Sequence, residues 1–172
     1  MSFLYIGIIV LLVAIDQITK FVMVSWLKPQ GTVELIPGFV RLRFVENDGA
    51  AFSMLNNARW FFVIIAAVGA IVCVALLVSK RLKYVHPALN SPFLKTAFII
   101  IAAGGLGNMI DRILRGTVVD FIEPTFVNFA VFNFADILVT CGAAIIIIYL
   151  VVDIIFDFSQ KRREIREYKK RR

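Results

Sequence analysis

Four long apolar stretches are the feature that most constrains this chain. They cover about residues 3–27, 58–79, 94–113 and 136–158, and each is close to the ~20 residues that a helix needs to cross a bilayer. Only 18% of the residues are charged, compared with about 25% in a soluble domain. The sequence therefore predicts an all-α polytopic membrane protein with four transmembrane helices, in one membrane-embedded domain over residues 1–160.

The basic residues between the stretches predict the orientation. Segment 80–95 carries four Lys and Arg and no acid, and the tail 161–172 carries eight. Cytoplasmic segments of membrane proteins are rich in Lys and Arg. We therefore expect both termini in the cytoplasm, and segments 28–57 and 111–136 on the outside. The tail is expected to attract anionic lipid head groups, because no nucleic-acid-reading motif accompanies it.

The two outer segments have different patterns. Residues 32–36 and 39–45 alternate apolar and polar side chains on either side of Pro37-Gly38, which is typical of two short strands around a turn. We expect a small outward-facing sheet over about residues 30–52. The second segment contains Pro124 and several Phe residues, from which we expect a short interfacial helix and loop.

Polar residues inside the apolar stretches are candidate functional residues, because ionisable groups in hydrocarbon are costly. Counting 1.5 Å per residue along each helix places several of them at one depth, in the outer half of the membrane. They are Asp16, Lys20, Asn108, Asp111 and Asp136. Their common depth predicts a shared polar pocket near the outer surface.

Some of these residues also have structural interpretations. Asp16 and Lys20 are four residues apart, so they share a helix face and are expected to form an ion pair that supports the site. Asp111 is either paired with Arg112 or in contact with a substrate, and both alternatives stay open. The glycines of segment 104–107 follow no strand and lack the third glycine of a phosphate loop. They are more typical of close helix packing, or of the approach of a substrate backbone.

Asp120 and Asp136 stand apart because apolar residues surround both. Burial disfavours the charged form of a carboxyl group, and two neighbouring carboxyl groups share one proton. Such a pair supplies a base that activates water and an acid that protonates a leaving group. The residues make Asp120 and Asp136 a candidate catalytic pair, provided that the fold brings them together.

Five motifs between residues 16 and 136 occur in the order found in one known family. They are Asp16-Gln17-Ile18-Thr19-Lys20, Asn47-Asp48-Gly49-Ala50-Ala51-Phe52, Gly104-Gly105-Leu106-Gly107-Asn108-Met109-Ile110-Asp111-Arg112, Val118-Val119-Asp120-Phe121 and Phe132-Asn133-Phe134-Ala135-Asp136. In these motifs the chain resembles the lipoprotein signal peptidases (signal peptidase II). Each motif alone has little specificity, whereas five in the correct order are very specific.

The resemblance implies an aspartic endopeptidase of the bacterial cytoplasmic (inner) membrane, with its active site near the outer face. Its substrate is a prolipoprotein, cleaved just before a cysteine that carries a diacylglyceryl group. Asp120 and Asp136 match the catalytic pair, and Asp111 is interpreted as a supporting residue. The other matching positions that line, support or bind substrate are Asp16, Lys20, Asn47, Gly104, Asn108, Arg112 and Asn133.

The resemblance also implies that no metal or organic cofactor takes part. The expected partners are the prolipoprotein, membrane lipids and cyclic peptide inhibitors such as globomycin, with no nucleic acid, and the expected state is a monomer. A single histidine, His86, argues independently against a His-rich metal site.

Three other functions fit part of the sequence. An ion-coupled transporter or channel would use the buried acids as a proton relay, but such proteins favour broken helices in repeated halves, which this chain lacks. A non-catalytic assembly subunit would use the acids to pair helices. A serine mechanism at Ser25 and Lys28 would need an orienting third group, and the sequence offers none nearby.

Overall fold

Four long helices make up most of the described chain. The structure is a computed structural model and describes residues 2–49, 58–79 and 87–170. The helices are α1 (Ser2–Val22), α2 (Arg59–Val78), α4 (Pro92–Arg115) and α5 (Phe134–Lys170). A π-helical segment, η1 (Met23–Leu27), continues α1, and a 3-10 turn, η3 (Pro87–Asn90), precedes α4. All four helices are long and apolar enough to cross a membrane, which confirms the predicted spans.

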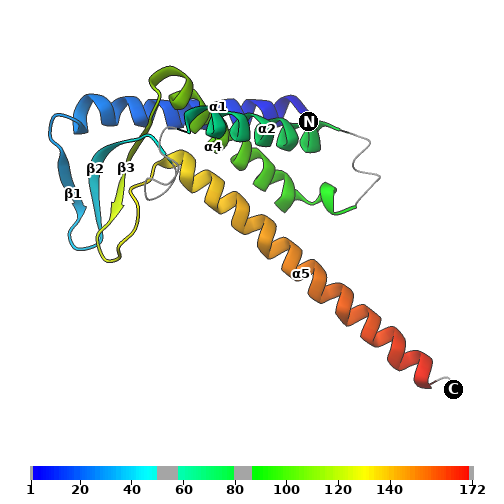
Figure 1. Ribbon diagram of the computed structural model, residues 1–172. Helices are drawn as coiled ribbons and strands as arrows, with labels where there is room; N and C mark the ends of the chain where they lie inside the picture. The colour runs from blue at the N-terminus through cyan, green and yellow to red at the C-terminus, as the bar shows by residue number, and fades with distance from the viewer. Residues whose placement is uncertain (1, 50–57, 80–86, 171–172) are drawn as a thin grey trace.

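Helix α4 is the centre of the bundle. It packs against α1, α2 and α5, and its buried face is rich in small residues such as Ala102, Ala103, Gly104 and Gly107. Small residues let helix backbones approach closely. Large apolar side chains of α1, α2 and α5 are exposed on the outside of the bundle, as expected for helices that face lipid. Figure 1 shows α1, α2 and α4 side by side, while α5 diverges from them.

Helix α5 is longer than predicted. It begins at Phe134 and continues to Lys170, whereas the apolar stretch covers about residues 136–158 and the basic tail was expected to follow it as a separate segment. The tail contains Lys, Arg and Glu, which are good helix formers, so the helix continues after the apolar residues end. A helix of 37 residues is about 55 Å long, well beyond the ~30 Å hydrocarbon core.

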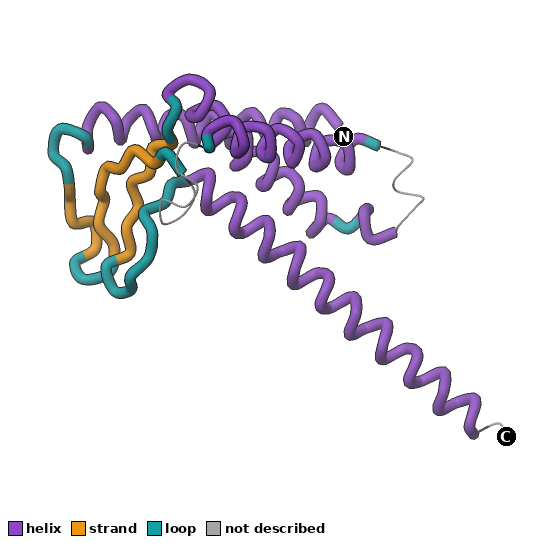
Figure 2. Tube along the Cα trace, viewed as in Figure 1, coloured by secondary structure: helices purple, strands orange, loops and turns teal. Residues whose placement is uncertain are grey.

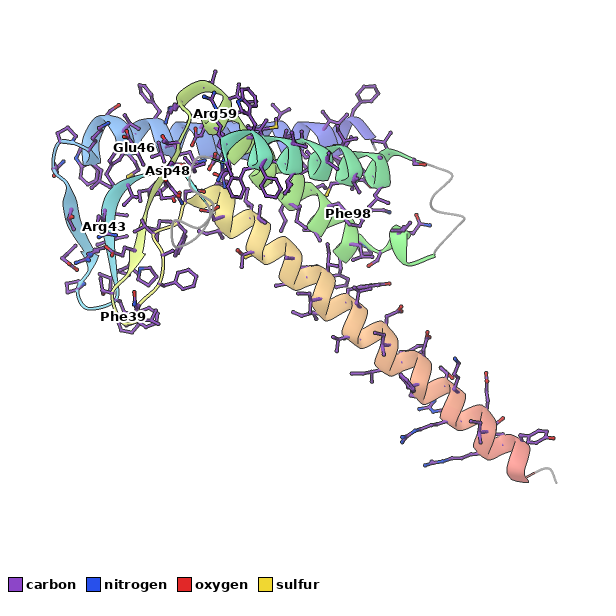
Figure 3. All side chains as sticks on the ribbon, viewed as in Figure 1. Phe39, Arg43, Glu46, Asp48, Arg59 and Phe98 are labelled. Atoms are coloured by element: carbon purple, nitrogen blue, oxygen red, sulfur yellow. The ribbon has the colours of Figure 1, made fainter. Side chains whose placement is uncertain are left out.

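Three antiparallel strands form a sheet at one end of the bundle, opposite the N-terminus (Figure 2). Strands β1 (Thr32–Ile36) and β2 (Val40–Asn47) confirm the predicted hairpin. In the turn between them, the Phe39 N–H donates to the Ile36 carbonyl over 2.9 Å. Gly38 has φ 74°, a conformation that glycine adopts without strain. Figure 3 shows Phe39 at the free end of the sheet and Phe98 inside the bundle.

The short helix predicted in the second outer segment is wrong for the described residues. Instead, β3 (Val118–Pro124) adds a third strand beside β2, and the following loop returns to it through a bridge between Ile122 and Phe132. The residues around Asp120 are β-branched or aromatic and therefore favour a strand. The free edge of β2, far away in sequence, supplies the hydrogen-bonding partner.

Two apolar clusters hold these parts together. One lies in the bundle and includes Ile9, Leu77 and Phe98. The other joins Leu27 at the end of η1 to Val119 and Phe121 of β3, and so fixes the sheet on the end of α1. Residues 50–52 of the predicted outer β segment, and His86, lie outside the described residues.

Candidate active site

Asp136 lies in the first turn of α5, where a reciprocal cap holds it. The Asn133 side-chain oxygen accepts the Asp136 backbone N–H over 3.0 Å. The Asp136 carboxylate accepts the Asn133 backbone N–H over 3.1 Å. This is the geometry of a capping box, here built from Asn and Asp. The cap fixes the carboxylate at the positive end of the helix dipole, which favours a negative charge.

Asp120 occupies the third position of β3, opposite Val45 of β2. Its side chain is buried and accepts two amide hydrogen bonds, from Asn133 Nδ2 over 2.6 Å and from Asn47 Nδ2 over 2.9 Å. Burial, followed by the charge of Asp136, raises the pKa of Asp120 to about 6, although both amide hydrogen bonds oppose the shift. Asp120 therefore keeps its proton at pH values where an exposed aspartate has lost it.

Side-chain amides join the two aspartates. Asn133 caps the helix that carries Asp136 and also donates to Asp120. Asn108 of α4 donates through Nδ2 to Asp136 Oδ1 over 2.7 Å, and its own oxygen accepts from Asn133 over 3.1 Å. The fold therefore brings Asp120 and Asp136 into one hydrogen-bonded cluster, as a paired site requires. Among the described residues, no cation forms an ion pair with either aspartate.

A cavity of about 680 Å³ opens beside the two aspartates, which both line it. Its walls come from α2, α5 and the loop after β3, and Gly105 and Ile101 of α4 also line it. Most of the lining is apolar, including Ile65 and Val139. Ligand sites combine such apolar walls with a few positioned polar groups. The cavity is suited to an apolar chain whose polar part reaches the carboxyl groups.

Arg112 also lines this cavity, as do Asn108 and both aspartates. Its guanidinium lies 4.8 Å from the centre of the Phe62 ring and donates to the Gly49 carbonyl over 3.1 Å. Asp111, the adjacent residue, is directed instead toward Lys20. The sequence left open whether Asp111 pairs with Arg112 or contacts a substrate. In the structure Asp111 pairs with Lys20 in the buried cluster, and Arg112 lines the cavity.

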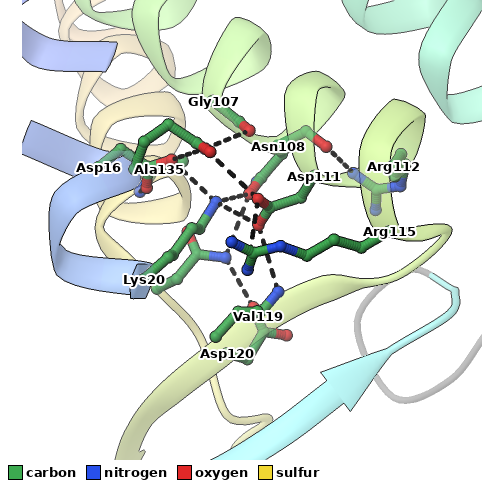
Figure 4. A network of polar contacts seen from close by, with 12 residues as sticks. Asp16, Lys20, Gly107, Asn108, Asp111, Arg112, Arg115, Val119, Asp120 and Ala135 are labelled. Carbon is green, nitrogen blue, oxygen red and sulfur yellow. Dashed lines mark hydrogen bonds and ion pairs between the residues drawn. The ribbon is translucent and has the colours of Figure 1, made fainter. Parts of the chain in front are cut away.

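Behind the aspartates, Lys20 is fully buried among three acceptors (Figure 4). Its ammonium lies 2.9 Å from Asp16, 3.1 Å from Asp111 and 2.8 Å from Asn108. The predicted ion pair of Asp16 and Lys20 is therefore confirmed and extends to α4. This cluster and the cavity residues lie at the end of the bundle that carries the sheet, as the predicted shared pocket requires.

The remaining predicted residue, Gly104, faces α5 rather than the cavity. A Cβ added there would collide with the Ala135 carbonyl oxygen, so the absence of a side chain allows α4 and α5 to pack closely. The structure adds four residues to the predicted site: Gln17, Gly105, Gly107 and Phe62. Gln17 donates to Asp16, to Asp111 and to the Gly107 carbonyl. Gln17 and Gly107 both lie within the family motifs, so their position in these motifs could have identified them.

The described residues do not support a serine mechanism at Ser25 and Lys28. The Ser25 hydroxyl donates to the Phe21 carbonyl over 2.9 Å, and Lys28 pairs with Glu46 over 2.7 Å, so neither residue activates the other. No group of three or more His, Cys, Asp or Glu among these residues is arranged to hold a metal ion. Cys73 and Cys141 are free thiols.

Fold and site together define a membrane-embedded protein with a paired-carboxylate site next to an apolar cavity. The sequence profile of signal peptidase (SPase) II matches residues 8–152. A lipoprotein signal peptidase of Symbiobacterium thermophilum is 41% identical over 146 residues, covering 81% of this chain and 89% of that protein. One from Streptococcus pyogenes serotype M5 is 39% identical over 149 residues, covering 86% and 92%. The chain belongs to the signal peptidase II family of bacterial membrane proteases.

Two solved structures are similar as well. One is described as a bacterial membrane enzyme solved in meso at 2.3 Å resolution; it has a TM-score of 0.74 and 36% identity, and covers 87% of this chain and 88% of its own. The other, described in the same words at 1.9 Å resolution, has a TM-score of 0.70 and 36% identity, with 85% and 91% coverage. The family assignment disfavours the transporter alternative.

Proposed function

We propose that this protein is an aspartic endopeptidase that removes signal peptides from diacylglyceryl-modified prolipoproteins, with Asp120 and Asp136 as its catalytic pair. The observation that carries the proposal is their placement. Asn133 links both carboxyl groups beside one apolar cavity. The substrate class comes from the resemblance and the named relatives, and the apolar cavity suits a lipid-bearing peptide.

The proposed reaction uses one shared proton. Asp136, held as a hydrogen-bond acceptor on both oxygens, takes a proton from water as the water oxygen adds to the scissile carbonyl carbon. Asp120, whose pKa is raised, gives its proton to the amide nitrogen as the C–N bond breaks. The products are a carboxylic acid and an amine, and the pair again holds one proton. This reaction requires no cofactor.

The proposal assigns the surrounding residues to the substrate. Asn47, Asn108 and Asn133 orient the two carboxyl groups through their amides. Arg112, at the cavity, offers hydrogen-bond donors to a peptide carbonyl. Cyclic peptide inhibitors such as globomycin would occupy the same cavity. The chain is proposed to act as a monomer, as the resemblance implies.

The proposed orientation places the sheet and the aspartates near the outer face of the cytoplasmic membrane and both termini in the cytoplasm. The distribution of Lys and Arg supports it, as does the position of the sheet at the end of the bundle opposite the N-terminus (Figure 1). A scissile bond just outside the membrane would then meet the aspartates, while the lipid chains remain in the bilayer.

Cleavage of a purified diacylglyceryl prolipoprotein in detergent tests the proposal. Asp120→Asn and Asp136→Asn should each lower the rate by about 10³-fold or more, because a carboxamide neither takes nor gives the proton. Asp157→Asn, an exposed aspartate of α5, is the matched control and should cleave like the wild type. Cleavage that survives either substitution would remove the pair from the mechanism.

A further inference from the structure

Two backbone amides are held by the buried cluster behind the active site. Asp16 Oδ1 accepts the Ala135 N–H over 3.0 Å, and Asp111 Oδ2 accepts the Val119 N–H over 3.3 Å. Ala135 immediately precedes Asp136, and Val119 immediately precedes Asp120. Each supporting carboxylate therefore fixes the backbone next to one proposed catalytic residue.

Lys20 joins these two contacts. Its ammonium lies 2.9 Å from Asp16 Oδ2 and 3.1 Å from Asp111 Oδ2, and all three side chains are fully buried. A buried charge is tolerated only where partners compensate it. The single cation therefore holds together two carboxylates that would otherwise repel each other, and through them the start of α5 and strand β3.

The same ammonium also fixes the orientation of Asn108. Lys20 donates to Asn108 Oδ1 over 2.8 Å, and a flipped amide would place its N–H₂ group against the ammonium, where both groups are donors. The Asn108 Nδ2 atom must therefore face Asp136 Oδ1, to which it donates over 2.7 Å. Lys20 keeps a hydrogen-bond donor on Asp136 without touching it.

Glycine at position 107 makes this arrangement possible. A Cβ added to Gly107 would collide with the Asp16 carboxylate, so the bare α4 backbone leaves the space in which Asp16 reaches Ala135. Neither Lys20 nor Asp16 nor Asp111 lines the cavity. The cluster is thus placed to act on the catalytic pair and not on the substrate.

We propose that Lys20 is the positioning residue of this site, which sets the separation of the Asp120 and Asp136 carboxyl groups through Asp16, Asp111 and Asn108. The proposal rests on the proposed function, because it takes these two aspartates as the catalytic pair. It goes further because it makes one buried cation responsible for how β3 and α5 are placed relative to each other.

A crossed set of variants tests this role, with two measurements on folded protein in detergent micelles. The first is the amide resonance of Val119 and of Ala135 in isotope-labelled protein. The second is kcat and KM for a diacylglyceryl prolipopeptide. Asp16→Asn should shift the Ala135 resonance alone, Asp111→Asn the Val119 resonance alone, and Lys20→Met both.

The kinetic expectation follows the same pattern. A displacement near 1 Å costs about 100-fold in rate, so Lys20→Met should lower kcat by about 100-fold and each carboxylate variant by about tenfold. KM should stay within about twofold, since none of the three residues lines the cavity. A purely stabilising role would lower the yield of folded protein and leave kcat per folded molecule unchanged.

Two further variants keep the test valid if Lys20→Met does not fold. Gly107→Ala displaces Asp16 without changing any charge, and should shift the Ala135 resonance and lower kcat by about tenfold. Gly7→Ala is its matched control, because a Cβ at Gly7 meets no atom within 4 Å. Arg115→Met is the matched control for Lys20, because Arg115 approaches Asp111 only to 3.9 Å and from an accessible position.

The outcomes separate this proposal from the proposed function. If the wild type does not cleave the prolipopeptide, the proposed function fails, while the amide resonances still report on the contacts of Lys20. If the wild type cleaves and Lys20→Met or Gly107→Ala retains kcat within about threefold, the positioning role is rejected. Unchanged Val119 and Ala135 resonances in Lys20→Met reject it too.

Discussion

Two pairs of aspartates lie close together in this protein, and they differ in the charge of their partners. Behind the site, Asp16 and Asp111 share the buried ammonium of Lys20. At the cavity, Asp120 and Asp136 accept hydrogen bonds from neutral side-chain amides and from a backbone N–H. A nearby cation stabilises an ionised carboxylate, whereas burial without a paired cation raises the pKa of Asp120 to about 6. The partners of these acids thus differ in the way that the proposed division into supporting and catalytic residues requires.

The strongest way to remove this contrast is to place a cation beside Asp120 and Asp136. Asn47→Lys would place an ammonium beside Asp120 in place of an amide that now donates over 2.9 Å. The added charge would lower the pKa of Asp120 and so remove, at pH 5, the proton that Asp120 holds there in the wild type. We expect kcat to fall by about 100-fold or more, within the usual range for loss of general acid catalysis.

Asn47→Gln is the matched control for that change, because it lengthens the side chain without adding charge. It should retain most of the activity that Asn47→Lys loses. If Asn47→Lys retained as much activity as an active Asn47→Gln variant, the catalytic pair would work beside a cation as well.

The pH dependence of cleavage directly tests the proposed pair of Asp120 and Asp136. The pKa of Asp120 is raised from 3.8 to about 6, first by burial, so the residue keeps its proton up to about pH 6. We expect kcat/KM to fall as the pH rises through about 6, by up to tenfold per pH unit, because the pair then loses its general acid. A rate that instead increases from pH 6 to 8 would make Asp120 the base.

Stability should follow the same titration. A carboxyl group with a raised pKa in the folded state contributes stability that is fully present below pH 3.8 and is lost as the pH rises through about 6. The melting temperature of the wild type, compared with that of Asp120→Asn, should therefore fall between pH 4 and pH 7. A constant difference over this range would contradict the raised pKa.

A smaller effect is expected at Arg112, the cation at the edge of the cavity. Arg112→Lys keeps the charge but loses the planar group that lies over Phe62 at 4.8 Å and donates to Gly49. Because the two side chains are not interchangeable in such positions, KM should rise by about tenfold while kcat changes little. Arg112→Met should raise KM no less than Arg112→Lys, and the reverse order would exclude a binding role.

The smallest effect is expected on the sheet. Glu123 is hydrogen-bonded by Arg41, which lowers the pKa of its carboxyl group, and Arg43 lies 3.3 Å away. Because Arg41 itself is accessible and Arg43 would still compensate the charge of Glu123, Arg41→Met should leave cleavage within about threefold of the wild type. A larger loss, measured with the same prolipopeptide, would give the sheet a direct part in substrate binding.

Much of this arrangement was predictable from the sequence. The four apolar stretches predicted the helices, and Pro37-Gly38 predicted the hairpin, because both depend on local composition and turn chemistry. The spacing of Asp16 and Lys20 predicted their ion pair, since four residues make one helical turn. The motifs predicted the family, which the comparisons confirm, and they selected the residues of the proposed site.

The tertiary structure decided what no local pattern encodes. Strand β3 exists because β2, more than 70 residues earlier, offers a free edge. Asp120 and Asp136 meet because Asn133 caps α5 and reaches β3 with the same side chain. Lys20 pairs not only with Asp16 but also with Asp111 of another helix. The sequence by itself determined which helices form and which acids stand out. Only packing, which joins distant segments and removes water from them, decided that Asp16 and Asp111 share a cation. Packing likewise placed Asp120 and Asp136 in one cluster of side-chain amides.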